Sequence, residues 1–172
     1  QKVYQNVNNA TKSGFNVTFD LSKLSFDASD QLQVISRYSD AQNGEGNRVD
    51  FWFAPTSREN QGNLDSANFS NGQLVVNGWH ANDASTIAPN HFLILFDRTA
   101  NKQAASLSAS QVNRPDVAKA FGAIQTAGKA GFTGTFNANV IIPGHEYSLV
   151  SRYSTSANGN GDQGHYVDYW FN

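Results

Sequence analysis

The chain has no cysteine among its 172 residues. Disulfide bonds and thiolate metal sites are therefore absent, which excludes zinc ribbons and several classes of enzyme. A chain of this length buries enough surface to fold without covalent links. The length suits one domain, or two small ones that share an interface.

Charge is also scarce. Charged residues make up 15% of the chain, the net charge is −2, and no run of lysine or arginine occurs. Binding to nucleic acid through phosphate neutralisation is therefore not expected. No stretch approaches eighteen consecutive apolar residues, and the amino terminus lacks a charged-then-apolar signal pattern. We expect no membrane partner, and either a mature fragment or an internal module of a larger parent protein.

Residues suited to catalysis or metal binding are few. The glutamates are Glu45, Glu59 and Glu146, and two of them lie in Gly-rich or turn-like surroundings. No acid and base pair of the glycosidase type emerges, and no nucleophile-elbow spacing supports a Ser-His-Asp triad. Between residues 40 and 50, Gly44 occupies a position where a calcium loop needs an oxygen ligand. We predict no enzyme activity, no cofactor and no metal; a looser calcium site remains an alternative.

The chain does contain an internal repeat. The matching blocks, earlier copy first, are residues 49–53 and 167–171, residues 35–39 and 150–154, and residues 13–15 and 130–132. Their common order marks a duplicated structural unit. We predict a single binding domain over residues 1–172, built from a partial repeat (1–53) and a full repeat (72–172). The alternative is two small tandem units.

Apolar and polar residues alternate over most of the chain, which predicts half-buried strands. The neutral polar residues Asn, Ser, Gly, Ala and Thr are abundant and aromatics reach 12%, a composition common in secreted all-β binding modules. Helical spacing occurs at Pro115, Val117, Phe121 and Ile124, with an equivalent at residues 3–10. We therefore predict an all-β fold: a jelly-roll-like β-sandwich with one or two short helices.

Each copy of the repeat combines an arginine, an aspartate and a tryptophan. The two sets are Arg37, Asp50 and Trp52, and Arg152, Asp168 and Trp170. The two-residue period of a strand places Asp50 and Trp52 on one face, and Arg37 pairs with Asp50 if the two strands form a hairpin. The same logic applies to the later copy.

These sets have two interpretations. In the structural one, an Arg–Asp pair fixes a hairpin and the tryptophan packs over the arginine stem. In the functional one, the indole stacks on the apolar face of a sugar ring while Asp and Arg hydrogen-bond its hydroxyls.

A second candidate site is the Trp79-His80 pair, which occurs once and follows a predicted strand near a loop. Trp79 is the first choice for a stacking residue, and His80 is an orienting group. The structural alternative is that Trp79 caps the core and His80 satisfies a backbone carbonyl.

The order of several motifs resembles a known family. The motifs are Gly-Trp-His-Ala at 78–81, residues 90–97, Arg-Pro-Asp-Val at 114–117, Ala-Gly-Phe at 130–132, residues 150–154 and residues 166–171. Together they resemble the repeated modules of surface proteins and cell-wall lysins of lactic-acid bacteria and their phages. The resemblance covers 72–172 as a full unit and 1–53 as a partial one. The chain departs from the family pattern by opening at the helix instead of the Trp-His segment.

The resemblance implies attachment to a bacterial envelope, and phage distal-tail proteins also resemble carriers of inserted carbohydrate-binding modules. We predict a non-catalytic carbohydrate-binding module that attaches a phage tail protein or a cell-wall lysin (endolysin) to cell-surface polysaccharide during host recognition and adsorption. Its expected location is extracellular, on the bacterial surface or the virion tail. The alternatives are a structural or protein-adhesion β domain and, less favoured, a cell-wall hydrolase.

Overall fold

The computed structural model describes residues 12–17, 19, 33–53, 59–86, 88–159 and 166–171. Its strands are β1 (Ile35–Ser39), β2 (Arg48–Trp52), β3 (Asn60–Ser70), β4 (Gln73–Asn82), β5 (Asn90–Asp97), β6 (Lys102–Ser108), β7 (Ser110–Val112), β8 (Gly131–Asn137), β9 (Tyr147–Ser154) and β10 (Tyr166–Phe171). The helical segments are α1 (Pro115–Ala120) and three 3₁₀ turns, η3 (Asp83–Thr86), η4 (Ala127–Lys129) and η5 (Ala138–Val140).

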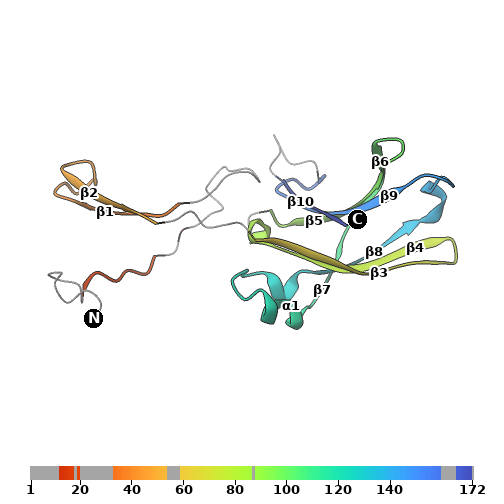
Figure 1. The fold of residues 1–172 in the computed structure, drawn as a ribbon, viewed down its shortest axis with the longest axis horizontal. Helices are drawn as coiled ribbons and strands as arrows, with labels where there is room; N and C mark the ends of the chain where they lie inside the picture. Colours follow the sequence, from red (N-terminus) through yellow and green to blue (C-terminus); the bar gives the residue numbers. More distant parts are fainter. Residues whose placement is uncertain are drawn as a thin grey trace.

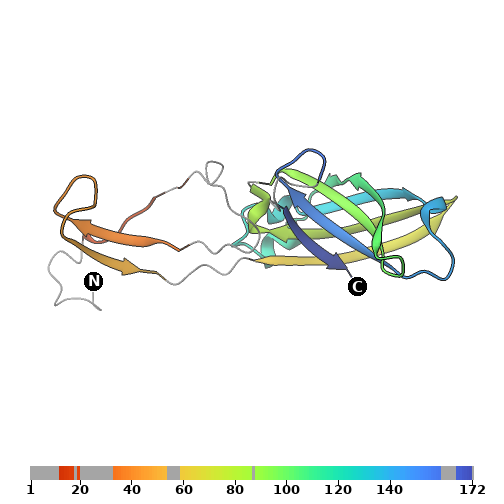
Figure 2. The same cartoon turned by 90° about the horizontal axis from the view of Figure 1, so that it is seen from above.

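Two four-stranded antiparallel sheets face each other as a sandwich (Figures 1 and 2). Their strand orders are β3-β4-β8-β7 and β10-β9-β5-β6. The consecutive strand pairs β3-β4, β5-β6, β7-β8 and β9-β10 each stay within one sheet, and the chain changes sheet between one pair and the next. β7 and β8 are joined through α1 and η4. The predicted all-β fold with few helices is confirmed. Eight strands in two sheets match the number in a jelly roll. The order of the strands in each sheet was not predicted from the sequence.

The core between the sheets follows from the two-residue period of the strands. Each of the inner strands points alternate apolar side chains toward the opposite sheet. The buried cluster consists of Leu74, Val76, Leu93, Leu95, Phe132, Phe136, Leu149 and Phe171. Most of this core therefore comes from strands that meet in space but lie far apart in sequence.

The predicted helix at Pro115 is confirmed over Pro115–Ala120, with the proline in its first turn. Beyond it the chain turns into η4, and Val117 and Ile124 are buried against Ala81 on the outer side of β4. Figure 1 shows α1 on the far side of the β3-β4-β8 layer from the other sheet. The helix predicted over residues 3–10 lies outside the described residues.

The sandwich includes one strand that lies ahead of the predicted full repeat (72–172). All eight of its strands come from residues 60–171, and the first of them is β3. β3 was missed because its sequence is almost entirely polar and carries Leu64 as its main apolar contact to the core. β1 and β2 pair only with each other among the described strands, and Figures 1 and 2 show this hairpin away from the sandwich.

The sandwich packs tightly around Gly78 in β4. A Cβ atom there would lie 2.5 Å from the Asn63 carbonyl oxygen and 2.7 Å from the Phe132 ring, whereas at Gly122 the nearest atom would be 3.6 Å away. We expect Gly78→Ala to lower the free energy of unfolding by about 1–3 kcal/mol because the core would be overpacked. Gly122→Ala should be neutral within about 0.5 kcal/mol. Urea unfolding of both variants tests this, and equal midpoints would contradict it.

Candidate functional site

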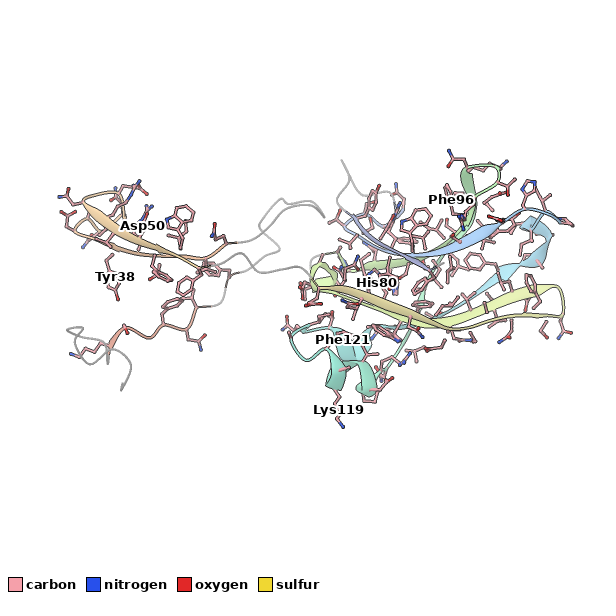
Figure 3. All side chains as sticks on the ribbon, in the orientation of Figure 1. Tyr38, Asp50, His80, Phe96, Lys119 and Phe121 are labelled. Carbon is pink, nitrogen blue, oxygen red and sulfur yellow. The ribbon has the colours of Figure 1, made fainter. Side chains whose placement is uncertain are left out.

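His80 lies between the two sheets at one end of the sandwich (Figure 3) and is 0% exposed. Its Nε2 is 2.7 Å from Asn60 Oδ1, and its Nδ1 is 2.9 Å from Ser151 Oγ. His91 Nε2 reaches the same Ser151 oxygen at 2.6 Å. Tyr153 donates its hydroxyl to the His80 carbonyl at 3.0 Å and stacks on the His91 ring at 4.2 Å between centroids.

The direction of these hydrogen bonds follows from Asn60. Its Nδ2 donates to the Asp168 carbonyl, so its Oδ1 accepts and His80 Nε2 carries the proton. His80 Nδ1 then accepts from Ser151, whose oxygen accepts from His91 Nε2–H. Both imidazoles are neutral in this chain of bonds. Burial lowers the pKa of His80 to about 3, with a further contribution from His91, and burial lowers the pKa of His91 to about 4.

This network satisfies buried polar groups and leaves no surface for a ligand at His80. The prediction that His80 orients a ligand is therefore wrong, because a bound molecule cannot reach a ring that is fully buried and bonded at both nitrogens. Trp79 points to the opposite side of β4, where its ring packs 5.3 Å from that of Phe121. It is partly buried against the cluster of Ala81, Val117 and Ile124, which agrees with the structural alternative that Trp79 caps a part of the core.

The outer face of the β10-β9-β5-β6 sheet presents a different tryptophan. Trp170 on β10 is 46% exposed, and its ring meets that of Phe96 on β5 edge-to-face at 5.3 Å across β9. Figure 3 shows Phe96 on the side of this sheet that faces away from the other sheet. On the same face, Val150 of β9 pairs with Trp170 and Ile94 of β5 pairs with Val150. Both of these side chains are buried. An aromatic pair therefore lies over a small apolar floor on a solvent-facing sheet.

Arg152 and Asp168 stand beside this pair and confirm the predicted cross-strand contact. The guanidinium donates to both carboxylate oxygens at 2.6 Å, and Nη1 also donates to the Gly159 carbonyl at 3.3 Å. The hydrogen bonds to Asp168 raise the pKa of Arg152. The aromatic ring under the guanidinium is Tyr166, 3.7 Å away, and not Trp170. The pair fixes the β9-β10 hairpin and leaves the indole free to face solvent.

The earlier copy repeats the arrangement. Arg37 donates from Nε to Asp50 Oδ1 at 2.7 Å and from Nη2 to Oδ2 at 2.9 Å, so this pairing is also confirmed. The hydrogen bonds from Arg37 lower the pKa of Asp50. Trp52 lies on the same face and is exposed. Phe96 and Ile94 have no counterpart among the described residues near Trp52, so this copy shows only half of the platform.

A small depression of about 90 Å³ continues the platform toward β6. It is lined by Ile94, Gln103, Ser106, Arg152 and Gly159, with Phe92 beneath the loop. Neutral hydrogen-bonding side chains thus lie near the exposed aromatics. Sequence reasoning missed Phe96, Gln103 and Ser106 because the continuous apolar run 91–96 does not reveal which of its residues face solvent.

A larger cleft of about 400 Å³ opens at the end of the sandwich, next to the buried histidine network. Its lining includes His91, Tyr153, Gln111, Thr126 and Lys129. The stacked rings of His91 and Tyr153 form part of its wall. Phe92 touches both the cleft and the depression, so the two hollows lie on either side of the loop after β9.

In the described part of the chain, no three His, Asp or Glu side chains gather closely enough to hold a metal ion. No described helix has the length and apolar character needed to cross a membrane. No protein-family model, curated protein or solved structure matches the chain. The fold and the site define an all-β sandwich with a solvent-facing aromatic platform.

The buried histidines predict how stability depends on pH. In the unfolded chain both side chains titrate near 6.5, while the folded chain keeps them neutral down to about pH 4. The unfolded state therefore binds more protons as the pH falls below 6.5, and the folded state loses stability in the same window. At pH 5 the loss should be about 2 kcal/mol for each histidine.

The measurement is urea unfolding at pH 7 and pH 5, with His91→Gln as the comparison. The variant removes one of the two titrating groups, so its loss between the two pH values should be about half that of the parent. Equal losses in the two proteins would show that other groups control the pH dependence.

Proposed function

We propose that residues 59–171 form a non-catalytic carbohydrate-binding module that recognises a neutral polysaccharide of the bacterial cell surface. The observation that supports this proposal is the exposed Trp170, which packs edge-to-face on the half-buried Phe96 on the outer face of the sheet, beside neutral polar side chains. An exposed aromatic face removes sugar C–H surface from water, while a few polar groups orient the hydroxyls.

Distances across the sheet favour an extended ligand. Four residues form one row across this sheet, each paired with the next: Trp170, Val150, Ile94 and Ser106. Trp170 and Ser106 are its two ends, on the edge strands β10 and β6. Neighbouring strands are about 4.8 Å apart, so the row spans about 14 Å. A polysaccharide chain lying along this row would stack on the indole and place hydroxyls in the depression near Gln103 and Ser106.

The resemblance to lysin and surface-protein modules supports the biological role. The module would hold a phage tail protein or a cell-wall lysin on the envelope of a lactic-acid bacterium, outside the cell. The low charge of the chain fits neutral polysaccharide better than anionic polymers. The rival proposal, a structural or protein-adhesion domain, is favoured by the small volume of the depression at the platform, about 90 Å³.

Cell labelling tests the function. A fluorescent copy of the chain is applied to lactic-acid bacterial cells, to protease-treated cells and to cells from which the polysaccharide has been extracted. Labelling should survive protease and disappear with the polysaccharide. Labelling that is lost with protease would instead support protein adhesion.

A pair of tryptophan variants tests the site. Trp170→Ala should weaken cell labelling at least about tenfold because it removes the stacking surface, and should lower stability by only about 1 kcal/mol. Trp79→Ala should lower stability by about 2–4 kcal/mol because it leaves a cavity under Phe121, while the folded protein still labels cells. Labelling curves and urea unfolding are measured for both.

The end cleft supplies the control. Gln111→Ala alters an exposed residue of that cleft and should leave labelling unchanged. If Gln111→Ala weakens labelling and Trp170→Ala does not, the saccharide binds in the cleft and the platform is not the site.

A further inference from the structure

The described residues around Phe15 and in the β1-β2 hairpin repeat, in sequence and in ring geometry, parts of the last three strands of the sandwich. The rings of Phe15 and Phe53 lie 5.8 Å apart at 71°, and those of Phe132 and Phe171 lie 5.7 Å apart at 61°. Phe51 meets Phe53 at 4.9 Å, where Tyr169 meets Phe171 at 5.0 Å.

The loops of the two hairpins match as well. Arg37 Nη1 donates to the Gly44 carbonyl at 3.4 Å, and Arg152 Nη1 donates to the Gly159 carbonyl at 3.3 Å. Both glycines have positive φ angles, +78° and +80°. The β1-β2 hairpin is therefore already in the conformation that β9-β10 has inside the sandwich.

What differs is burial. Tyr38, Val49 and Phe15 are 68%, 72% and 57% exposed. Their counterparts Tyr153, Val167 and Phe132 are 7%, 8% and 1% exposed. Figure 3 shows Tyr38 and Asp50 on opposite sides of the hairpin, so the exposed apolar side is distinct from the Arg37–Asp50 side. This apolar face, formed by Phe15, Tyr38, Val49, Phe51 and Phe53, is called the open face below.

The full unit shows what covers such a face. β9 pairs along its second edge with β5, and Leu93 and Leu95 of β5 join the core around Phe132 and Phe171. In the described part of the chain no strand pairs with the second edge of β1. The open face therefore lacks both an edge partner and an opposing sheet. In the full unit the segment from β3 to β7 supplies both: β5 pairs with the edge of β9, and β3, β4 and β7 belong to the opposing sheet.

We propose that the open face binds a segment of the same kind as residues 59–112, joined ahead of Gln1 in one polypeptide, to form a second sandwich. A second copy of the whole chain is a poorer occupant. Its own residues 59–112 are already paired with β8 and β9, and releasing them would expose an equal face elsewhere. This inference rests on the duplicated strands and does not depend on carbohydrate binding.

Joining a further copy of residues 59–114 directly to Gln1 of the full chain tests the proposal. Hydrogen exchange of the peptide 33–53 is compared in the fused and unfused proteins. In the fused protein the amides of β1 should exchange at least about 100-fold more slowly, because β1 gains a partner strand and the open face is covered. Unchanged exchange would overturn the proposal.

Phe51→Asp provides the matched control. Phe51 is exposed in the unfused chain, so there the substitution should leave the exchange of 33–53 unchanged. In the fused chain it places a carboxylate against the new core, where the corresponding Tyr169 of the full unit packs partly buried on Phe171, and should abolish the protection. Protection that appears in the unfused chain as its concentration rises would show that the occupant is a second copy, and would overturn the proposal.

Discussion

The sandwich depends on the pairing of the strands that precede α1 with the strands that follow it. β4 pairs with β8 and β5 pairs with β9, so in each sheet strands from before α1 pair with strands that follow it. Neither set of strands can bury its inner face without the other. Ordering these distant segments costs conformational entropy, and the burial of the apolar cluster that they enclose together offsets this cost.

Because of this constraint, the inner and outer faces of the sheets have different roles. The inner face is committed to packing, and its polar members, including His80 and Ser151, are satisfied by one another. The outer face of β10-β9-β5-β6 is free of that demand, so Trp170 stays exposed beside an arginine and an aspartate that hold the hairpin. A recognition surface can vary there without disturbing the core.

Local rules were sufficient for some features and not for others. The Arg37–Asp50 and Arg152–Asp168 contacts followed from the two-residue period and the matched spacing of two strands. Pro115 and the spacing of Val117 located the helix. β3 escaped notice because edge strands need little apolar surface. Alternation assigns Trp79 to the outer face of β4 but does not show that Phe121 packs against it there.

The sequence by itself determined the all-β class, the duplication, the hairpin register and the place of the helix, because each of these depends on neighbours within a few residues or on a visible repeat. The tertiary structure alone decided which side of each strand is buried, that His80 is inaccessible, and that residues 60–171 complete a sandwich without residues 12–53. The reason is physical: burial is a property of what packs against a face, and the packing partners here are distant in the chain.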